Sequence, residues 1–257
     1  MVVIAGIDLA WSGRRPTGVC IVECDGMHSR LLALSCTDST AGALEIAELL
    51  HQLGPDVVAG IDAPLIVGPA RHAEAELARS FGRQGVYAYA ARADFLQRHG
   101  IEEGPRLGRS LAMNGWNLDP SALAPGSAGR HALEVFPHAT TVSLLGSPRA
   151  LKYKKGRMAS RLEPLAALQS LLRTCAEREL PCLVAAEPTG ILTKPIGAQS
   201  IANLKSVEDR LDAICCAIAA HHIWKYGTAG LAMFGNSQNG YIAVPKPATS
   251  SPAPSFP

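Results

Sequence analysis

The first 62 residues alternate between apolar, β-rich runs and turn signals in an order that few folds accommodate. Three β-rich runs come first, with the hairpin signal Asp25-Gly26 between the second and the third. Thr37–Thr40 then offers N-caps for an amphipathic helix, which leads to a fourth run. A helical crossover of this kind places the strand after it parallel to the first strand. The predicted elements are strands at 2–8, 18–23, 31–36 and 57–61 and a helix ending near Leu53.

The rest of the chain continues an α/β pattern, and we expect a single domain over 1–245 with helices on both faces of a mixed sheet. The segment at 65–130 is rich in glycine, proline and short helical patterns, so we interpret it as a helical and loop insertion. Residues 246–257 are rich in proline and serine and predict a disordered tail. Further predicted elements are helices at 71–81, 89–99, 160–179 and 206–226, a fifth strand at 131–136 and an edge strand at 241–244.

The composition excludes several classes of protein. Hydrophobic residues make up 47% of the 257 residues and charged residues 18%, which is too apolar for a disordered or coiled-coil chain. The richest apolar run, 211–224, is interrupted by Asp212 and two histidines, so we expect no membrane span. The N-terminus lacks the basic region of a signal peptide, and the seven cysteines form no CxxC pair. We therefore expect a cytoplasmic protein with buried, reduced thiols.

Three acidic residues stand at or within predicted neighbouring strands. Asp8 and Asp62 each end an apolar strand, and Glu134 lies within the fifth strand. A carboxylate there is costly to bury unless something pairs with it, and ligands of open α/β sheets bind outside the carboxyl ends of the strands. Each residue alone has the simpler interpretation of a turn or cap. Together they predict a cluster at one edge of the sheet.

A late helix supplies two more carboxylates. Ser206 has the features of its N-cap, and Asp209 then falls at the third helical position, where a capping box explains it without function. Asp212 shares the apolar helix face that must pack on the sheet. Carboxylates that converge without basic partners repel one another, and a divalent cation is the usual remedy. We therefore expect Mg²⁺ or Mn²⁺ here, activating a water for phosphodiester hydrolysis.

The string of motifs resembles a known family. The chain contains the motifs GIDLAW, GIDAPL, RHAEAE, EVFPHAT, LKYKKG and EDRLDAICCAIAAH. Together these motifs are similar to the domain of unknown function 429 family, described as predicted nucleases of ribonuclease H-like fold. The late D-x-x-D is similar to that of RuvC-type junction resolvases, which place a Glu where this chain has Asp62. The resemblance covers about 1–227 and implies a nuclease acting on RNA or DNA. Its acidic positions carry over to Asp8, Asp62, Glu134, Asp209 and Asp212.

A basic segment follows the fifth strand and suggests how a substrate is held. Residues 149–161 contain six lysines and arginines and no acid, as a phosphate-binding loop requires, although a solvated loop explains them too. Lys152 and Lys155 are candidates for phosphate contacts, and Tyr153 for stacking on a base. Other candidate cleft residues are Trp11 as a floor, Arg71 as a further cation and His138 as a proton carrier, each with a structural alternative.

Two other functions fit the same residues. An actin-like phosphotransferase or ATPase reuses the β-β-β-α-β unit, but it needs a second copy of the unit, and only one triple-strand run is present. A non-catalytic module that binds a metal or small ligand in the carboxylate cleft is the second alternative, since a net charge of +2 does not by itself indicate a nucleic-acid partner.

Overall fold

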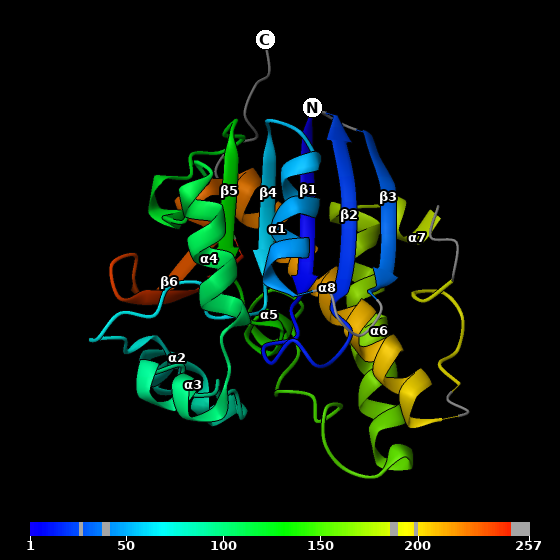
Figure 1. Ribbon diagram of the computed structural model, residues 1–257. Helices are drawn as coiled ribbons and strands as arrows, with labels where there is room; N and C mark the ends of the chain where they lie inside the picture. The colour runs from blue at the N-terminus through cyan, green and yellow to red at the C-terminus, as the bar shows by residue number, and fades with distance from the viewer. Residues whose placement is uncertain (26–27, 38–41, 186–189, 198–199, 248–257) are drawn as a thin grey trace.

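A five-stranded mixed sheet forms the centre of the protein in a computed structural model (Figure 1). Its strand order is β3-β2-β1-β4-β5, with β1, β2 and β3 antiparallel and with β4 and β5 parallel to β1. This confirms the expected mixed sheet of an α/β protein. The structure describes residues 1–25, 28–37, 42–185, 190–197 and 200–247. The strands are β1 (Val2–Asp8), β2 (Gly18–Asp25), β3 (His28–Cys36), β4 (Val57–Ile61) and β5 (Arg130–Glu134).

Helices cover both faces of the sheet, as the sequence predicts. Side chains alternate between the two faces along each strand, so each face has its own hydrophobic cluster. Ile46 and Leu107 belong to the cluster on one face, and Leu168 and Ile214 to the cluster on the other. The first face is covered by α1 (Ala43–Gln52) and α4 (Glu103–Met113), the second by α6 (Met158–Glu179) and α8 (Ile201–Tyr226) (Figure 1).

The first part of the chain between β4 and β5, with helices α2 (Ala73–Phe81) and α3 (Ala93–His99), lies beyond the carboxyl ends of the parallel strands (Figure 1). It packs against a separate two-stranded hairpin, where Ala73 and Leu77 share a third hydrophobic cluster with Ile242 and Val244. The predicted edge strand therefore exists but pairs mainly within this hairpin. The other elements concerned are η1 (Gly82–Gln84), β6 (Leu231–Asn236) and β7 (Gly240–Pro245). The remaining short elements are η2 (Pro120–Ala122), α5 (Pro137–Ser143), α7 (Cys182–Ala185) and η3 (Gly227–Gly230).

The long helix α8 lies directly on the backbone of the sheet through three glycines. A Cβ atom added at Gly6, Gly18 or Gly60 would lie 2.0, 2.1 or 2.4 Å from a main-chain oxygen of α8. These glycines stand on the adjacent strands β1, β2 and β4. Only glycine permits so close an approach, and it brings the carboxylates of α8 to the ends of β1 and β4.

The structure corrects several boundaries predicted from the sequence. Helix α8 begins at Ile201, and its N-cap is Ser200, whose hydroxyl accepts a hydrogen bond from the Asn203 N–H at 3.1 Å. Ser206 is thus inside the helix, so the capping-box explanation of Asp209 is wrong. Helix α1 has Gly42 as its N-cap, whereas Asp38–Thr40 of the predicted caps lie outside the described residues. Gly26 of the hairpin signal and 248–257 of the predicted tail also lie outside them.

Helix α4 was not predicted because its own sequence argues against a helix. It contains Gly104, Pro105 and Gly108, which are poor helix formers. Tertiary packing overrides this propensity, since a Cβ at Gly108 would lie 2.1 Å from the Leu65 carbonyl oxygen. The glycines thus let α4 lie close against the chain that leaves β4.

Two compositional expectations can also be compared with the structure. No helix among the described residues combines the length and the apolarity needed to cross a membrane. Buried free thiols are found at Cys24, Cys175, Cys182, Cys215 and Cys216, as expected.

The contact between α8 and the sheet predicts a large effect of a single added methyl group. We expect Gly6→Ala to lower the free energy of unfolding by about 3 kcal/mol, because neither the Ala213 carbonyl nor the strand has room to move. Gly197→Ala is the control, since no atom lies within 4 Å of a Cβ at that exposed position. Urea unfolding followed by circular dichroism measures both variants. Equal stability of the two would contradict the close packing of α8.

Candidate active site

Asp8 and Asp62 lie side by side at the carboxyl ends of two parallel strands. Asp8 is the last residue of β1, and Asp62 directly follows β4 and donates its N–H to the Ile7 carbonyl at 2.9 Å. By strand alternation both side chains share the sheet face of Gly6 and Gly60, the face that packs on α8. Both residues are buried, at 9% and 8% exposure. The structure therefore places these two carboxylates together, where the sequence predicted a cluster.

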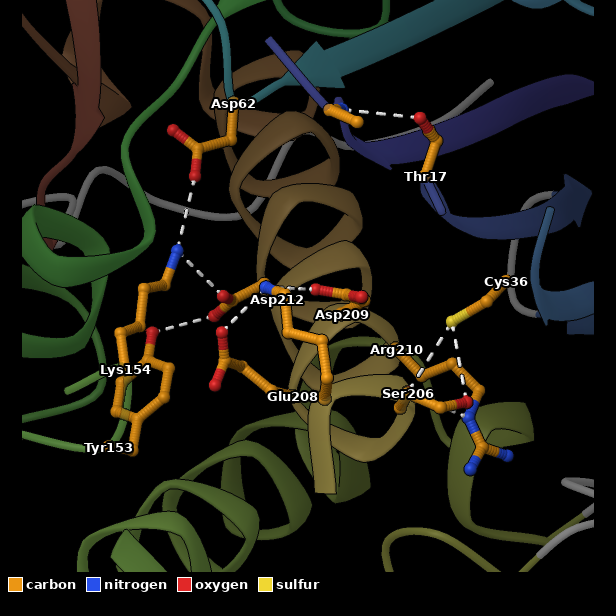
Figure 2. Close-up of polar contacts among 12 residues, drawn as sticks. Thr17, Cys36, Asp62, Tyr153, Lys154, Ser206, Glu208, Asp209, Arg210 and Asp212 are labelled. Carbon is orange, nitrogen blue, oxygen red and sulfur yellow. Dashed lines mark hydrogen bonds and ion pairs between the residues drawn. The ribbon is translucent and has the colours of Figure 1, made fainter. Parts of the chain in front are cut away.

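Helix α8 adds Asp212 to this pair, and Lys154 lies between Asp212 and Asp62 (Figure 2). The Lys154 Nζ atom is 2.8 Å from Asp212 Oδ2 and 3.6 Å from Asp62 Oδ2. The hydroxyl of Tyr153 donates a hydrogen bond to Asp212 Oδ1 at 2.6 Å. Asp212 itself is fully buried. Its two oxygens thus have different partners, a phenol and an ammonium group, both from the loop before α6.

The electrostatics of this cluster depend on Lys154. Burial raises the pKa of Asp62 to about 6 and that of Asp8 well above its usual value, while Lys154 lowers both. Burial on its own would lower the pKa of Lys154, but Asp212, Tyr153, Asp8 and Asp62 raise it well above its ordinary value. Lys154 is therefore charged, and it offsets the repulsion between the carboxylates around it.

Asp209 forms a second ion pair one turn earlier on α8. Lys205 Nζ lies 2.5 Å from Asp209 Oδ1 and 2.7 Å from Glu208 Oε1. The guanidinium of Arg161 pairs with the other oxygen of Glu208, and its Nε donates to the Tyr153 carbonyl at 2.6 Å. The Asp209 carboxylate also contacts that of Asp8, so this second ion pair adjoins the carboxylates at the strand ends.

These ion pairs correct the premise from which the metal was predicted. The carboxylates do not converge without basic partners, because Lys154 and Lys205 stand among them. In the described ranges, no group of three or more His, Cys, Asp or Glu side chains is arranged to hold a metal ion. The donor set nevertheless consists of carboxylate oxygens, the ligands that Mg²⁺ and Mn²⁺ prefer.

Glu134 belongs to a different part of the site. It pairs in register with Ile61, whose side chain lies on the α1 and α4 face, so it starts from the face opposite to Asp62. Its carboxylate accepts two hydrogen bonds from Arg71, at 2.5 and 3.1 Å, and a third from the Leu65 N–H. Arg71 is itself buried and also pairs with Glu74. Both predicted residues are thus brought to the site, but as an ion pair that fixes the start of the insertion.

The other predicted residues have more varied roles. Trp11 donates its indole N–H to the Asp62 carbonyl at 2.8 Å and so holds the end of β4. His138 lies against the rings of Phe136 and Tyr153, and burial lowers its pKa to about 4, so it is neutral near pH 7. Tyr153 is fully buried and cannot stack on a base, which corrects that prediction.

A cavity of about 1030 Å³ opens beside the carboxylates. At the sheet, the cavity is lined by Asp8, Asp62, His138 and Trp11. From the loop after α5, it is lined by two exposed lysines, Lys152 and Lys155. Further residues line the cavity that the sequence pattern did not single out, and Lys154 is the most important of them. The basic run at 149–161 indicated that a lysine could reach the site, but nothing in the pattern showed which lysine points inward. Arg15, Tyr87 and Tyr89 also line the cavity without having been predicted, whereas Arg149 belongs to the predicted basic segment.

The fold and the site define an α/β protein with a carboxylate and lysine cluster at the ends of parallel strands. Residues 6–236 match the family model described as "Protein of unknown function (DUF429)". Since the match covers most of the chain, the chain belongs to this family, as its motifs predicted. Among the curated proteins and the solved structures, no significant match is found.

Removal of the Lys154 ammonium group is expected to destabilise the fold. Lys154→Met leaves the buried Asp62 and Asp212 without their cation, and breaking a buried ion pair is strongly unfavourable, so we expect a loss of about 2 kcal/mol at pH 8. Lys152→Met removes a neighbouring exposed lysine and serves as the control. Thermal unfolding in EDTA gives the comparison, and equal melting temperatures would show that Lys154 does not support the carboxylates.

The environment of His138 predicts an unusual titration. The imidazole should remain neutral down to about pH 4, because burial and Lys154 both lower its pKa while Asp212 raises it. Lys154→Met removes one of the two lowering effects, so the pKa of His138 should rise in that variant. Histidine side-chain NMR spectra recorded from pH 8 to pH 4 test this, with His138→Gln to assign the signal. A pKa that is unchanged or lower in the variant would contradict the assigned cause.

Proposed function

We propose that this protein is a divalent-metal-dependent phosphodiesterase acting on nucleic acid, built on a ribonuclease H-like fold. One observation carries the proposal. Asp8, Asp62 and Asp212 come from two parallel strands and one helix and meet beside a cavity with cationic side chains on its wall. Carboxylates at such a point suit metal ions, and the surrounding cations suit phosphate groups.

The topology supports the ribonuclease H-like part of the proposal. Three antiparallel strands are followed by a helical crossover and two strands parallel to the first. The acidic residues end β1 and β4, and the third comes from a late helix on the opposite face from α1. This is the arrangement that the motif resemblance implies.

The residues present fit a divalent cation, on the condition that Lys154 moves. Asp8, Asp62 and Asp212 would hold the ion, and Asp209, which contacts Asp8, would complete or tune the site. When bound, the ion would activate a water and stabilise the leaving oxygen of the phosphodiester. The Lys154 ammonium group lies between Asp62 and Asp212, where the ion would bind.

The chain's own residues have separate roles in this proposal. Lys152, Arg83 and Arg149 line the cavity wall and attract the phosphates. Tyr153 orients Asp212 through its hydroxyl group. The pair Glu134 and Arg71 positions the cavity wall and is not itself part of the ion's ligand set.

A second candidate is a module that binds its ligand without turnover. The observation in its favour is that Lys154 and Lys205 already satisfy the carboxylates. An actin-like phosphotransferase is less well supported, since the other sheet in the described residues is the two-stranded hairpin of β6 and β7 and not a second copy of the strand and helix unit. A cytoplasmic location is part of the proposal, supported by the buried free thiols.

Cleavage assays with Mg²⁺ or Mn²⁺ test the proposed function. We expect cleavage of RNA or DNA by the wild type and no activity in EDTA. Asp62→Asn and Asp212→Asn should each lower the rate at least about a hundredfold, equivalent to about 3 kcal/mol of barrier. Asp25→Asn makes the same chemical change at an exposed position at the far end of β2 and should keep full activity.

Folding of every variant is checked by circular dichroism, and ATP is included as a substrate for the phosphotransferase alternative. Binding of an oligonucleotide without cleavage under all metal conditions would support the second candidate. Transfer or hydrolysis from ATP alone would contradict the nuclease proposal.

A further inference from the structure

Two exposed tyrosines are among the residues that line the cavity. Tyr87 and Tyr89 are 66% and 62% exposed, although tyrosine is on average more buried. They lie between η1 and α3 in a segment without regular secondary structure. Neither the proposed chemistry nor the packing of the core uses these rings.

The segment is anchored so that both tyrosines are left exposed. Val86 is fully buried in the third hydrophobic cluster, and Ala88 packs against that cluster. Burial therefore alternates along the segment, with Tyr87 and Tyr89 at the exposed positions. The Tyr87 hydroxyl donates to the Gly82 carbonyl at 3.1 Å, which fixes that ring over η1.

Cationic side chains accompany the two rings. Lys155 donates to the Tyr89 hydroxyl at 3.0 Å, and its Nζ atom lies 5.3 Å from the centre of that ring. Arg83, Arg149 and Lys152 line the same cavity, and in the part of the chain that the structure describes they make no ion pair with an acidic side chain. The Ala150 N–H donates to the Gln84 carbonyl at 2.8 Å, so the segments that carry these groups are joined.

We propose that Tyr87 and Tyr89 form a stacking platform for the bases of single-stranded nucleic acid, whose phosphates lie on Arg83, Lys152 and Arg149. This inference rests on the proposed function and names its substrate class. Aromatic faces bind bases only where these are not already stacked in a duplex, and the nearby cations track the backbone. A single strand on the platform runs through the cavity toward Asp62.

Oligonucleotide binding in Ca²⁺ or EDTA tests this platform without turnover. The probes are fluorescein-labelled oligomers of 12 deoxythymidines and of 12 uridines, and a duplex of equal length, measured by fluorescence anisotropy. Tyr87→Ala and Tyr89→Ala should each weaken single-strand binding about tenfold, as expected for the loss of one stacked base. The corresponding Tyr→Phe variants keep the ring and should bind within about twofold of the wild type.

Two further variants separate stacking from charge. Met113→Ala removes a large exposed side chain on α4, outside the cavity, and should bind like the wild type. Lys152→Met should lower the slope of log Kd against log salt concentration by about one, the value for one lost phosphate contact. The tyrosine variants should leave that slope unchanged. The difference between the two oligomers shows whether RNA or DNA is preferred.

The outcomes distinguish this inference from the proposed function. Alanine variants that bind the single strands as well as the wild type does would overturn the platform even if cleavage is found. Stronger binding of the duplex than of the single strands, or no binding at all, overturns it too. Weakened binding in the alanine variants with no cleavage in any metal supports the platform and contradicts the proposed chemistry.

Discussion

The close approach of α8 to the sheet is the constraint on which the site depends. At three glycines on neighbouring strands, the backbone of α8 occupies the space that a side chain would otherwise fill. This contact determines how far along the sheet α8 lies, and therefore where its carboxylates meet those at the ends of β1 and β4. A side chain at any of the three positions would move the helix outward and separate Asp212 from Asp62 and Lys154. Packing of the core and geometry of the site are thus one property of this fold.

The carboxylate cluster shows how a chain can hold several acidic groups in its interior. Burial and mutual repulsion both disfavour the ionised forms, and Lys154 and Lys205 offset part of that unfavourable free energy. Both lysines come from elements next to the acids they serve, one from a loop and one from the same helix. The interior of the site therefore carries charges of both signs that compensate one another.

Sequence patterns predicted the strand order and the meeting of Asp8, Asp62 and Asp212, because strand ends and the apolar face of a helix follow from periodicity alone. They placed Glu134 in the same cluster, although its register with Ile61 puts it on the other face of the sheet. They also missed α4, since its glycines are favourable only against the backbone of Leu65. The inward lysine could not be singled out, because loop conformation decides which residue of a basic run points inward.

The ion pair of Arg71 with Glu134 has a consequence for the order in which the molecule assembles. The two residues are 63 positions apart in the chain, and both are buried where they meet. The insertion precedes β5 in the chain, so during synthesis Arg71 emerges before Glu134. Arg71 can already pair with Glu74 of its own segment, but its two bonds to Glu134 need β5 in place. The final position of this wall of the cavity therefore depends on a strand that is synthesised after it.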